Sequence, residues 1–250
     1  MIRISLILIF FLALNLNASA SVKNESVDSL YQIIKLSTDE PLNLTVSKTE
    51  IFINANFTDN AKISSLITRF IDRINQDHDQ TLQAKGYFIA GHLSQQKIQN
   101  LGDAIYFLDR AYEIATLNQN YNLMAKASLE AMESLGNIRM YDEALKYLFK
   151  LKGLISQHDG AIEHKSTKLY RMGWLYHKSG NDNLAIDYFN LALQKDDFEN
   201  DINTKMHLYN TWGLSYRRLG DFQNALKAFQ ESYAIASAEN NTFWKALVNG

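Results

Sequence analysis

Histidine and acidic side chains are the residues of this chain best suited to bind a metal or to transfer protons. The six histidines are His78, His92, His158, His164, His177 and His207. None occurs in an H-E-x-x-H motif or in another spacing that gathers zinc ligands on one helix face. The chain has no cysteine, so disulfides, thiolate metal sites and a cysteine nucleophile are excluded. We therefore expect surface or groove histidines and no metal site.

Four acidic residues gather in one short segment: Asp196, Asp197, Glu199 and Asp201. A calcium loop needs oxygen ligands at ordered positions and a glycine at its turn, and this segment lacks both. The pattern favours a solvated acidic loop. The sequence also contains no G-x-S-x-G, no phosphate-binding loop and no G-x-G-x-x-G. We predict no catalytic residues, no cofactor and no enzymatic activity.

Charge and composition narrow the class of partner. The chain has 250 residues and a formal net charge of -2, with acidic and basic residues mixed along its length. No basic stripe suggests a nucleic acid as partner. One proline and 11 glycines are few for a chain of this length, which favours long uninterrupted helices.

The first residues form a separate segment. Arg3 precedes an apolar run, Ile4–Leu14, and Ala18-Ser19-Ala20 fits a small-residue cleavage site. The run would be roughly 16 Å long as a helix, which is too short for a bilayer core of about 30 Å. We predict a signal peptide over residues 1–20 and a periplasmic or secreted mature chain. An uncleaved N-terminal anchor is the alternative, and no other segment is apolar enough to span a membrane.

An internal repeat organises the rest of the chain. An alanine followed four residues later by a large apolar residue occurs four times, as Ala104–Leu108, Ala144–Leu148, Ala185–Phe189 and Ala225–Phe229. These alanines are 40, 41 and 40 residues apart. The residues three positions further on are mostly small: Ala111, Leu151, Ala192 and Ser232. A weaker copy one period earlier places Ile63, Ile67, Phe70, Ile71 and Ile74 on one helical face. A constant period of this size indicates stacked supersecondary units.

Each of the last two copies also has a preceding helix. Tyr209, Trp212, Gly213 and Tyr216 lie at positions i, i+3, i+4 and i+7, and Leu169, Met172, Gly173 and Tyr176 repeat that spacing. Glycine inside a helix costs about 1 kcal/mol relative to alanine. Gly173 and Gly213 are tolerable if the paired helix approaches closely there. Between the two helices, Gly180-Asn181 and Gly220-Asp221 break the chain, and Asn181 and Asp221 are good N-caps.

These residues carry a resemblance to a known family. Tyr209-x2-Trp212-Gly213-x2-Tyr216 followed by Ala225-x3-Phe229 resembles the tetratricopeptide repeat, and Leu169 to Phe189 matches it as well. The two matches cover residues 166–238. The copies around Ala104 and Ala144 match only in their second helices, with Met132 where a small residue is expected. The resemblance implies an all-α fold, a right-handed α-solenoid of stacked antiparallel helix pairs.

Two features depart from the family pattern. The period here is about 40 residues, whereas the family period is about 34. Asp197 and Ser237 stand where the helix-ending proline belongs. Without proline the helices can continue, so we expect longer helices. The chain is similar to long-helix variants such as the exported sensor regions of bacterial membrane signalling proteins.

We divide the chain into four segments. Residues 1–20 are the signal peptide, 21–42 an N-terminal helical segment, and 43–238 the repeats, in which 49–57 is helix rather than strand. Residues 239–250 begin the first helix of a further, incomplete repeat. Its apolar residues are Phe243, Trp244, Ala246, Leu247 and Val248. A continuation of the chain, self-association of two copies or a partner could cover its apolar face, and we expect a continuation.

The resemblance also implies where a ligand binds. In the family, one face of the first helices lines a concave groove. By motif position the corresponding residues are Tyr170, Trp174, His177, Lys178, His207, Asn210, Leu214, Arg217 and Arg218. That set is aromatic and basic and contains no carboxylate, which suits an acidic peptide or a C-terminal carboxylate. An ordinary solvated face is the alternative. Tyr176, Phe189, Tyr209, Trp212 and Tyr216 are expected in the core.

We therefore predict an extracytoplasmic module that binds a protein or peptide and has no catalytic activity of its own. A narrower version is the sensor region of a membrane signalling protein of the histidine kinase or transcriptional regulator type. The alternative is a helical-repeat enzyme or carbohydrate-binding subunit. Such a protein would require clustered carboxylates in a pocket, and the pattern offers none.

Overall fold

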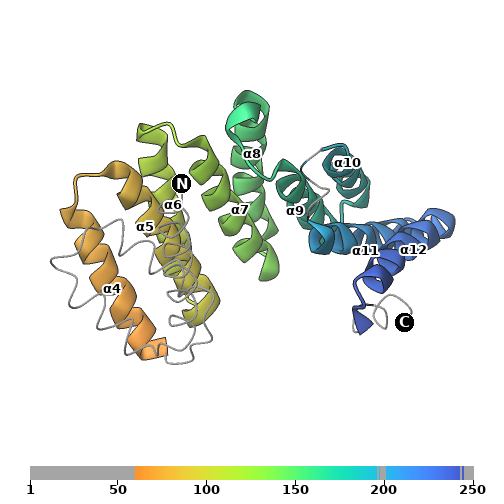
Figure 1. Ribbon diagram of the computed structural model, residues 1–250, viewed down its shortest axis with the longest axis horizontal. Coiled ribbons are helices and arrows are strands. Elements are labelled where there is room, and N and C mark those ends of the chain that lie inside the picture. The colour runs from red at the N-terminus through yellow and green to blue at the C-terminus, as the bar shows by residue number, and fades with distance from the viewer. Residues whose placement is uncertain (1–59, 196, 198–200, 243, 245–250) are drawn as a thin grey trace, which may run out of the picture. The chain divides into compact units, whose positions relative to one another are not determined.

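The structure is a computed structural model that describes residues 60–195, 197, 201–242 and 244 (Figure 1). Three predicted segments, residues 1–20, 21–42 and 43–59, lie outside the described residues, as do Phe243 and residues 245–250. The chain divides into two compact units, Met1–Leu123 and Met124–Gly250, and each is treated by itself below.

The described residues form helices and no strand, so the protein is an all-α helical-repeat solenoid, as predicted. The first unit contains α4 (Asn60–Gln76), α5 (Gln80–Leu93), a π-helical turn (Ser94–Ile98) and α6 (Leu101–Leu117). The next elements are α7 (Tyr121–Asn137), which spans the unit boundary, α8 (Tyr141–Gln157), a 3-10 turn (Asp159–Ala161), α9 (Lys165–Lys178), α10 (Asp182–Leu193), α11 (Ile202–Arg218) and α12 (Phe222–Ala238).

Helix length explains most of the long period. Six helices, α4, α6, α7, α8, α11 and α12, have 17 residues each, as expected for a chain with almost no proline. The third pair differs, because α9 and α10 have only 14 and 12 residues. In that repeat, the residues that lengthen the period beyond the family's period of about 34 belong to the connection between Gln194 and Asp201 and not to the helices.

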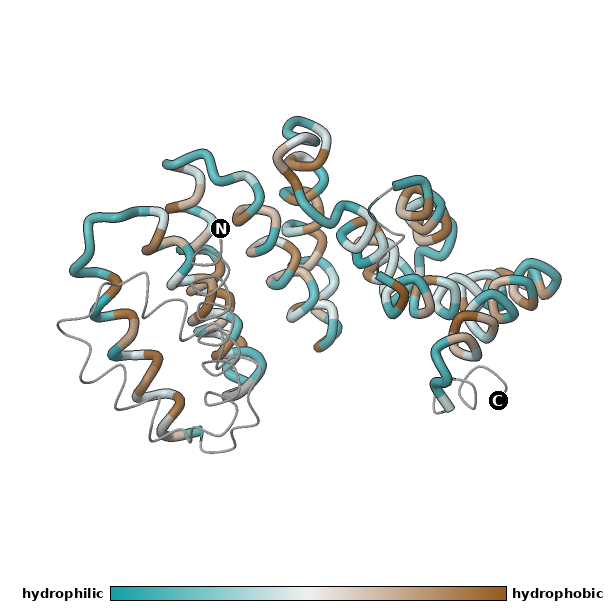
Figure 2. Tube along the Cα trace, viewed as in Figure 1, coloured by the Kyte–Doolittle hydropathy of each residue, from teal (hydrophilic) through white to brown (hydrophobic). Residues whose placement is uncertain are grey.

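The predicted repeat positions form the core. Ala104, Ala144, Ala185 and Ala225 are all buried, as are the large residues Leu108, Leu148 and Phe189. The residues three positions after the large residue of each copy are also completely buried: Ala111, Leu151, Ala192 and Ser232. In α4 the residues predicted to share one helical face are buried, apart from Ile71, which is half-buried. Hydrophobic residues recur along each helix between hydrophilic ones, which is the pattern of helices buried on one side (Figure 2).

Glycines in the first helices let the paired helix approach. A Cβ atom on Gly173 would lie 2.6 Å from the ring of Phe189 and 3.1 Å from the carbonyl oxygen of Ala185. A Cβ on Gly213 would lie 2.6 Å from the ring of Phe229. Side chains do not tolerate such distances, so these positions need glycine.

Gly91 shows that α5 keeps the packing of the motif although its sequence spacing departs from it. A Cβ on Gly91 would lie 2.7 Å from Leu108 and 3.1 Å from the carbonyl oxygen of Ala104, which is the same environment as that of Gly173. The motif is hidden because Gly91 precedes its alanine by 13 residues, whereas Gly173 precedes Ala185 by 12. The π-helical turn at Ser94–Ile98 accommodates the additional residue.

The turn between paired helices also repeats. The residue in the left-handed conformation is Gln99, Arg139, Gly180 or Gly220, with φ of 58°, 66°, 88° and 81°. These residues are again 40, 41 and 40 positions apart. The next amide then bonds back to the helix, as in Asn181 N–H to Tyr176 O at 2.8 Å and Asp221 N–H to Tyr216 O at 2.9 Å. Asn181 and Asp221 cap the second helices, as predicted.

The close approach at Gly173 makes a testable prediction. Gly173→Ala should lower the free energy of unfolding by about 1–3 kcal/mol, because the new methyl group overlaps Phe189 and the Ala185 carbonyl. Gly153→Ala in α8 is the matched control, since a Cβ there has no neighbour within 4 Å. It should stabilise the protein by about 1 kcal/mol through helix propensity. Urea titrations measure both, and a stabilising Gly173→Ala would contradict the packing described here.

Candidate protein-interaction groove

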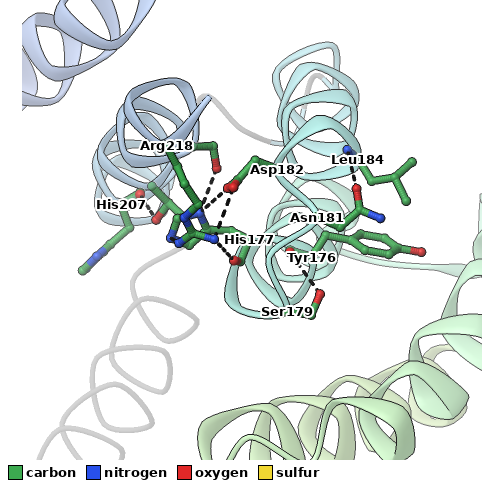
Figure 3. Close-up of polar contacts among 10 residues, drawn as sticks. Tyr176, His177, Ser179, Asn181, Asp182, Leu184, His207 and Arg218 are labelled. Atoms are coloured by element: carbon green, nitrogen blue, oxygen red, sulfur yellow. Dashed lines mark hydrogen bonds and ion pairs between the residues drawn. The ribbon is translucent and has the colours of Figure 1, made fainter. Parts of the chain in front are cut away.

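A buried polar network joins the end of α9 to α10 and α11 (Figure 3). His177 Nδ1 lies 2.8 Å from Asp182 Oδ1 and 2.9 Å from Ser215 Oγ. Arg218 donates from Nη1 to the carbonyl oxygen of His177 at 2.8 Å and forms an ion pair with Asp182 Oδ2 at 3.2 Å. Its Nη2 lies 3.2 Å from His177 Nε2. The Asp182 side chain is only 2% exposed, so its charge is compensated entirely within this network.

The contacts fix the protonation state of His177. Arginine has only donors, so His177 Nε2 must accept from Arg218 and the ring proton must be on Nδ1. Burial lowers the pKa of His177, and the nearby Arg218 lowers it further, against the opposing effect of Asp182. His177 is therefore neutral near pH 7.

Histidine, serine and aspartate in contact raise the question of a catalytic triad. In a triad the serine and the aspartate bind opposite ring nitrogens, so that one nitrogen can take the serine proton. Here Ser215 and Asp182 share Nδ1, and Nε2 faces a guanidinium. This arrangement can hold Arg218 in place, but it cannot activate Ser215 as a nucleophile.

A surface pocket of about 320 Å³ opens beside this network, lined by His177, Leu214, Arg217 and Arg218. The Arg218 side chain is 47% exposed. Arg217 is exposed and makes no hydrogen bond or ion pair with the residues that the structure describes. The pocket thus offers two guanidinium groups beside an apolar side chain.

The other predicted groove residues differ in accessibility. Lys178 is exposed, with its Nζ 5.8 Å from the ring centroid of Trp174, which is half-buried. Trp174 extends to α7, where its ring lies 3.0 Å from the position of a Cβ on Gly136. Asn210 is half-buried. His207 is exposed, and its ring centroid lies 4.2 Å from that of Trp244.

Two groove predictions need correction. Tyr170 is only 3% exposed and packs with its ring centroid 6.1 Å from that of Phe189. His177 is buried in the network described above. Both face the neighbouring helices, because the motif register indicates a helix face but not how far a side chain turns from it. Tyr170 can support a ligand site only through other residues, whereas the exposed edge of His177 lines the pocket.

The first-helix face also contains a carboxylate that the predicted set lacked. Glu133 on α7 lies 3.0 Å from Arg171 Nε on α9. Burial raises the pKa of Glu133, while Arg171 lowers it. This pair could not be predicted from the sequence, because α7 departs from the family motif and Arg171 follows the predicted position Tyr170.

Part of the acidic segment is structural, so the prediction of a solvated loop was wrong for two of its residues. Asp197 accepts hydrogen bonds from the amides of Lys165 and Ser166, 2.5 and 3.1 Å away, at the start of α9. Asp201 caps α11 through the Thr204 amide and accepts from Thr167 Oγ1 at 3.2 Å. Asp197, at the position of the family proline, therefore caps the start of α9.

At the C-terminal side, α12 ends at Ala238 and the chain is helical again at Thr242 and Trp244. Trp244 Nε1 donates to Ser232 Oγ at 3.0 Å, and Ser232 Oγ donates to Met206 O at 3.0 Å. Trp244 is therefore buried against α11 and α12.

The predicted core aromatics divide into two groups. Tyr176 and Phe189 are buried. Tyr209, Trp212 and Tyr216 are half-buried and stack along α11, with successive ring centroids 5.9 and 5.8 Å apart.

Paired helices with a small residue at each crossing and a left-handed turn between them define a helical-repeat protein of the α-solenoid type. The tetratricopeptide repeat model matches residues 169–196 and 207–239, so these two segments are tetratricopeptide repeats. These are the two copies in which the full motif is visible in the sequence.

Solved structures with similar folds are distant in sequence. BtubC (BKLC) from P. vanneervenii has a TM-score of 0.70 and 18% identity, with 89% of this chain and 91% of that chain covered. MamA has a TM-score of 0.54 and 16% identity, with 72% of this chain and 92% of that chain covered. A putative kinesin light chain from Podosopora anserina with nearly identical TPR-like repeats has a TM-score of 0.58 and 9% identity, covering 80% and 97%. No protein with a curated description matches the sequence. At these identities the structural likeness concerns the fold.

Within the described ranges, no helix is long and apolar enough to cross a bilayer. The same ranges contain no group of three or more histidine, aspartate or glutamate side chains arranged to hold a metal ion. The candidate site is therefore the pocket at Arg217 and Arg218 and the adjoining first-helix face. Tetratricopeptide repeats are in general non-catalytic scaffolds for protein–protein interaction, which fits a site of this kind.

The contacts of Asp197 predict a pH-dependent contribution to stability. Burial opposes ionisation of Asp197, but hydrogen bonds from Ser166 and Lys165 outweigh burial and lower the pKa below 3.8. Asp197→Ala should lower the free energy of unfolding by about 1–2 kcal/mol at pH 7. Because the folded pKa is the lower one, this difference should be complete above about pH 4 and should disappear as the pH falls through the folded pKa. Asp187→Ala, an exposed change on α10, is the control. An equal loss in both variants would contradict a capping role.

Proposed function

We propose that this chain binds a carboxylate-bearing segment of another protein along the first-helix face of α7, α9 and α11, and that it has no chemistry of its own. The observation that supports this proposal is the group of accessible cations Lys178, Arg217 and Arg218. Asp182, the acidic residue that contacts Arg218, is buried and already paired. The group therefore attracts anions.

The physical basis is charge-assisted hydrogen bonding next to apolar surface. A guanidinium can bind a carboxylate through two parallel N–H donors, and such bonds are roughly twice as strong as neutral ones. Leu214 in the pocket and the half-buried Trp174 supply apolar surface close to these cations. The contact of His177 with both Asp182 and Ser215 through Nδ1 supports a binding role over a catalytic one.

A peptide selection tests this proposal. Displayed random peptides with free C-termini should be enriched in aspartate, glutamate or C-terminal carboxylates near an apolar residue. Arg217→Ala with Arg218→Ala should weaken the binding of a selected peptide by about tenfold or more, because charged hydrogen bonds are lost. Added salt should weaken this binding too. Lys227→Ala on α12 is the control for charge. Selected peptides that lack acidic residues and bind the double variant equally well would overturn the proposal.

We further propose that the protein acts outside the cytoplasm, as the input region of a membrane signalling protein. The short apolar run and small-residue site within residues 1–20 support export, and a rigid repeat array suits detection of a protein or peptide ligand.

Export can be tested with a reporter. Residues 1–30 fused to a bacterial alkaline phosphatase that lacks its own leader should give phosphatase activity, since that enzyme is active only after export. Leu8→Arg with Phe10→Arg should abolish this activity by interrupting the apolar run. An inactive fusion with the unaltered residues, in cells that contain the fusion protein, would refute export.

A further inference from the structure

We propose that Asp182 and neutral His177 are positioning residues for Arg218, so that the pocket binds a carboxylate only while His177 is unprotonated. This inference rests on the proposed function, because it concerns how the same pocket recognises its ligand and how that recognition is regulated.

The N–H donors of Arg218 show which edge of its guanidinium is available to bind a ligand. A guanidinium has five N–H donors. Nη1 donates to the His177 carbonyl oxygen and forms an ion pair with Asp182 Oδ2, and Nη2 uses one N–H on His177 Nε2. Nε–H and the second Nη2–H have no partner among the described residues. These two donors form one edge of the guanidinium, and that edge can bind both oxygens of a single carboxylate.

The buried side of the site keeps that edge in place. Free arginine side chains lose considerable conformational entropy when they bind a ligand. Here Asp182 and the His177 carbonyl already hold the guanidinium before any ligand arrives. Arg217 has no such support, so it adds positive charge, whereas Arg218 supplies a fixed geometry.

His177 makes this arrangement sensitive to pH. The charged or polar groups around its ring are Lys178 on α9, Asp182 on α10, and Ser215 and Arg218 on α11. A second ring proton would be on Nε2, facing Arg218 Nη2, where two donors and two positive charges would then meet. Asp182 would pair more strongly with the imidazolium, and Arg218 would turn away from the pocket. Carboxylate binding should therefore weaken as the pH falls through the protonation of His177.

The test uses trifluoroacetate, a carboxylate that stays ionised throughout, detected by fluorine NMR against chloride at equal ionic strength. The wild-type chain should show saturable binding at pH 7.5 that weakens about tenfold or more once His177 is protonated. Arg218→Lys keeps the charge but loses the paired donors, and it should bind weakly at every pH. Lys227→Ala, an exposed change on α12 outside the pocket lining, should behave as wild type.

His177→Gln and Asp182→Asn test the positioning residues. Glutamine retains an acceptor but cannot titrate, so His177→Gln should bind with a flat pH profile. Asp182→Asn should weaken binding at pH 7.5, because Arg218 loses its ion pair. Should these buried changes disturb folding, the imidazole carbon-bound proton signal of His177 in the wild type gives its protonation directly. The midpoint of that signal should coincide with the midpoint of the loss of binding.

The outcomes separate this inference from the proposed function. Wild-type binding that does not change with pH, or that changes equally in His177→Gln, overturns the role of His177. Trifluoroacetate binding no stronger than that of chloride overturns the carboxylate pocket, even if selected acidic peptides still require Arg217 and Arg218. Conversely, the peptide selection can fail by itself, because it probes the longer groove and not the single pocket.

Discussion

The close crossing of two helices within each pair is the constraint on which the rest of the structure depends. In three of the four described pairs, glycine on the first helix faces a large side chain of the second helix at that point, and no Cβ can be added without overlap. In the pair of α7 and α8, Met132 takes this position. The crossing aligns the two helices so that one row of large side chains is buried between them. All four described pairs keep this alignment through a left-handed turn at an equivalent position, whether or not that residue is glycine.

The buried positions could be predicted from the sequence because they obey one period. Ala104 and Leu148 were located by counting alone, although the first helices of their pairs did not match the family motif. The exception at Gly91 has a physical reason. A π-helical turn inserts one residue between the glycine and its alanine, so a search for a fixed spacing misses the glycine while the packing remains the same.

The site was less predictable, because its properties depend on contacts between different repeats. The motif register identified Arg217 and Arg218 but gave no indication that Asp182, in another helix, is buried and holds one of them. Likewise, Asp197 looked like a solvated acid because its hydrogen-bond donors, the amides at the start of α9, precede it by more than thirty residues. Polar contacts of this kind have no period, so neither counting nor composition can reveal them.

Residues at equivalent repeat positions show how a uniform scaffold acquires an asymmetric surface. Three sets of equivalent positions on α7, α9 and α11 are Glu133, Trp174 and Leu214; Gly136, His177 and Arg217; and Asn137, Lys178 and Arg218. The first helix contributes a carboxylate to this face, and the third contributes two guanidinium groups. Four of these positions, Asn137, Lys178, Arg217 and Arg218, are exposed, so they can vary while the helices keep their packing. The resulting gradient from acidic to basic gives the face a direction, and a bound segment with carboxylates at one end would be oriented by it. Specificity in such an array therefore depends on the few positions that the repeat leaves free, and its stability on those that it fixes.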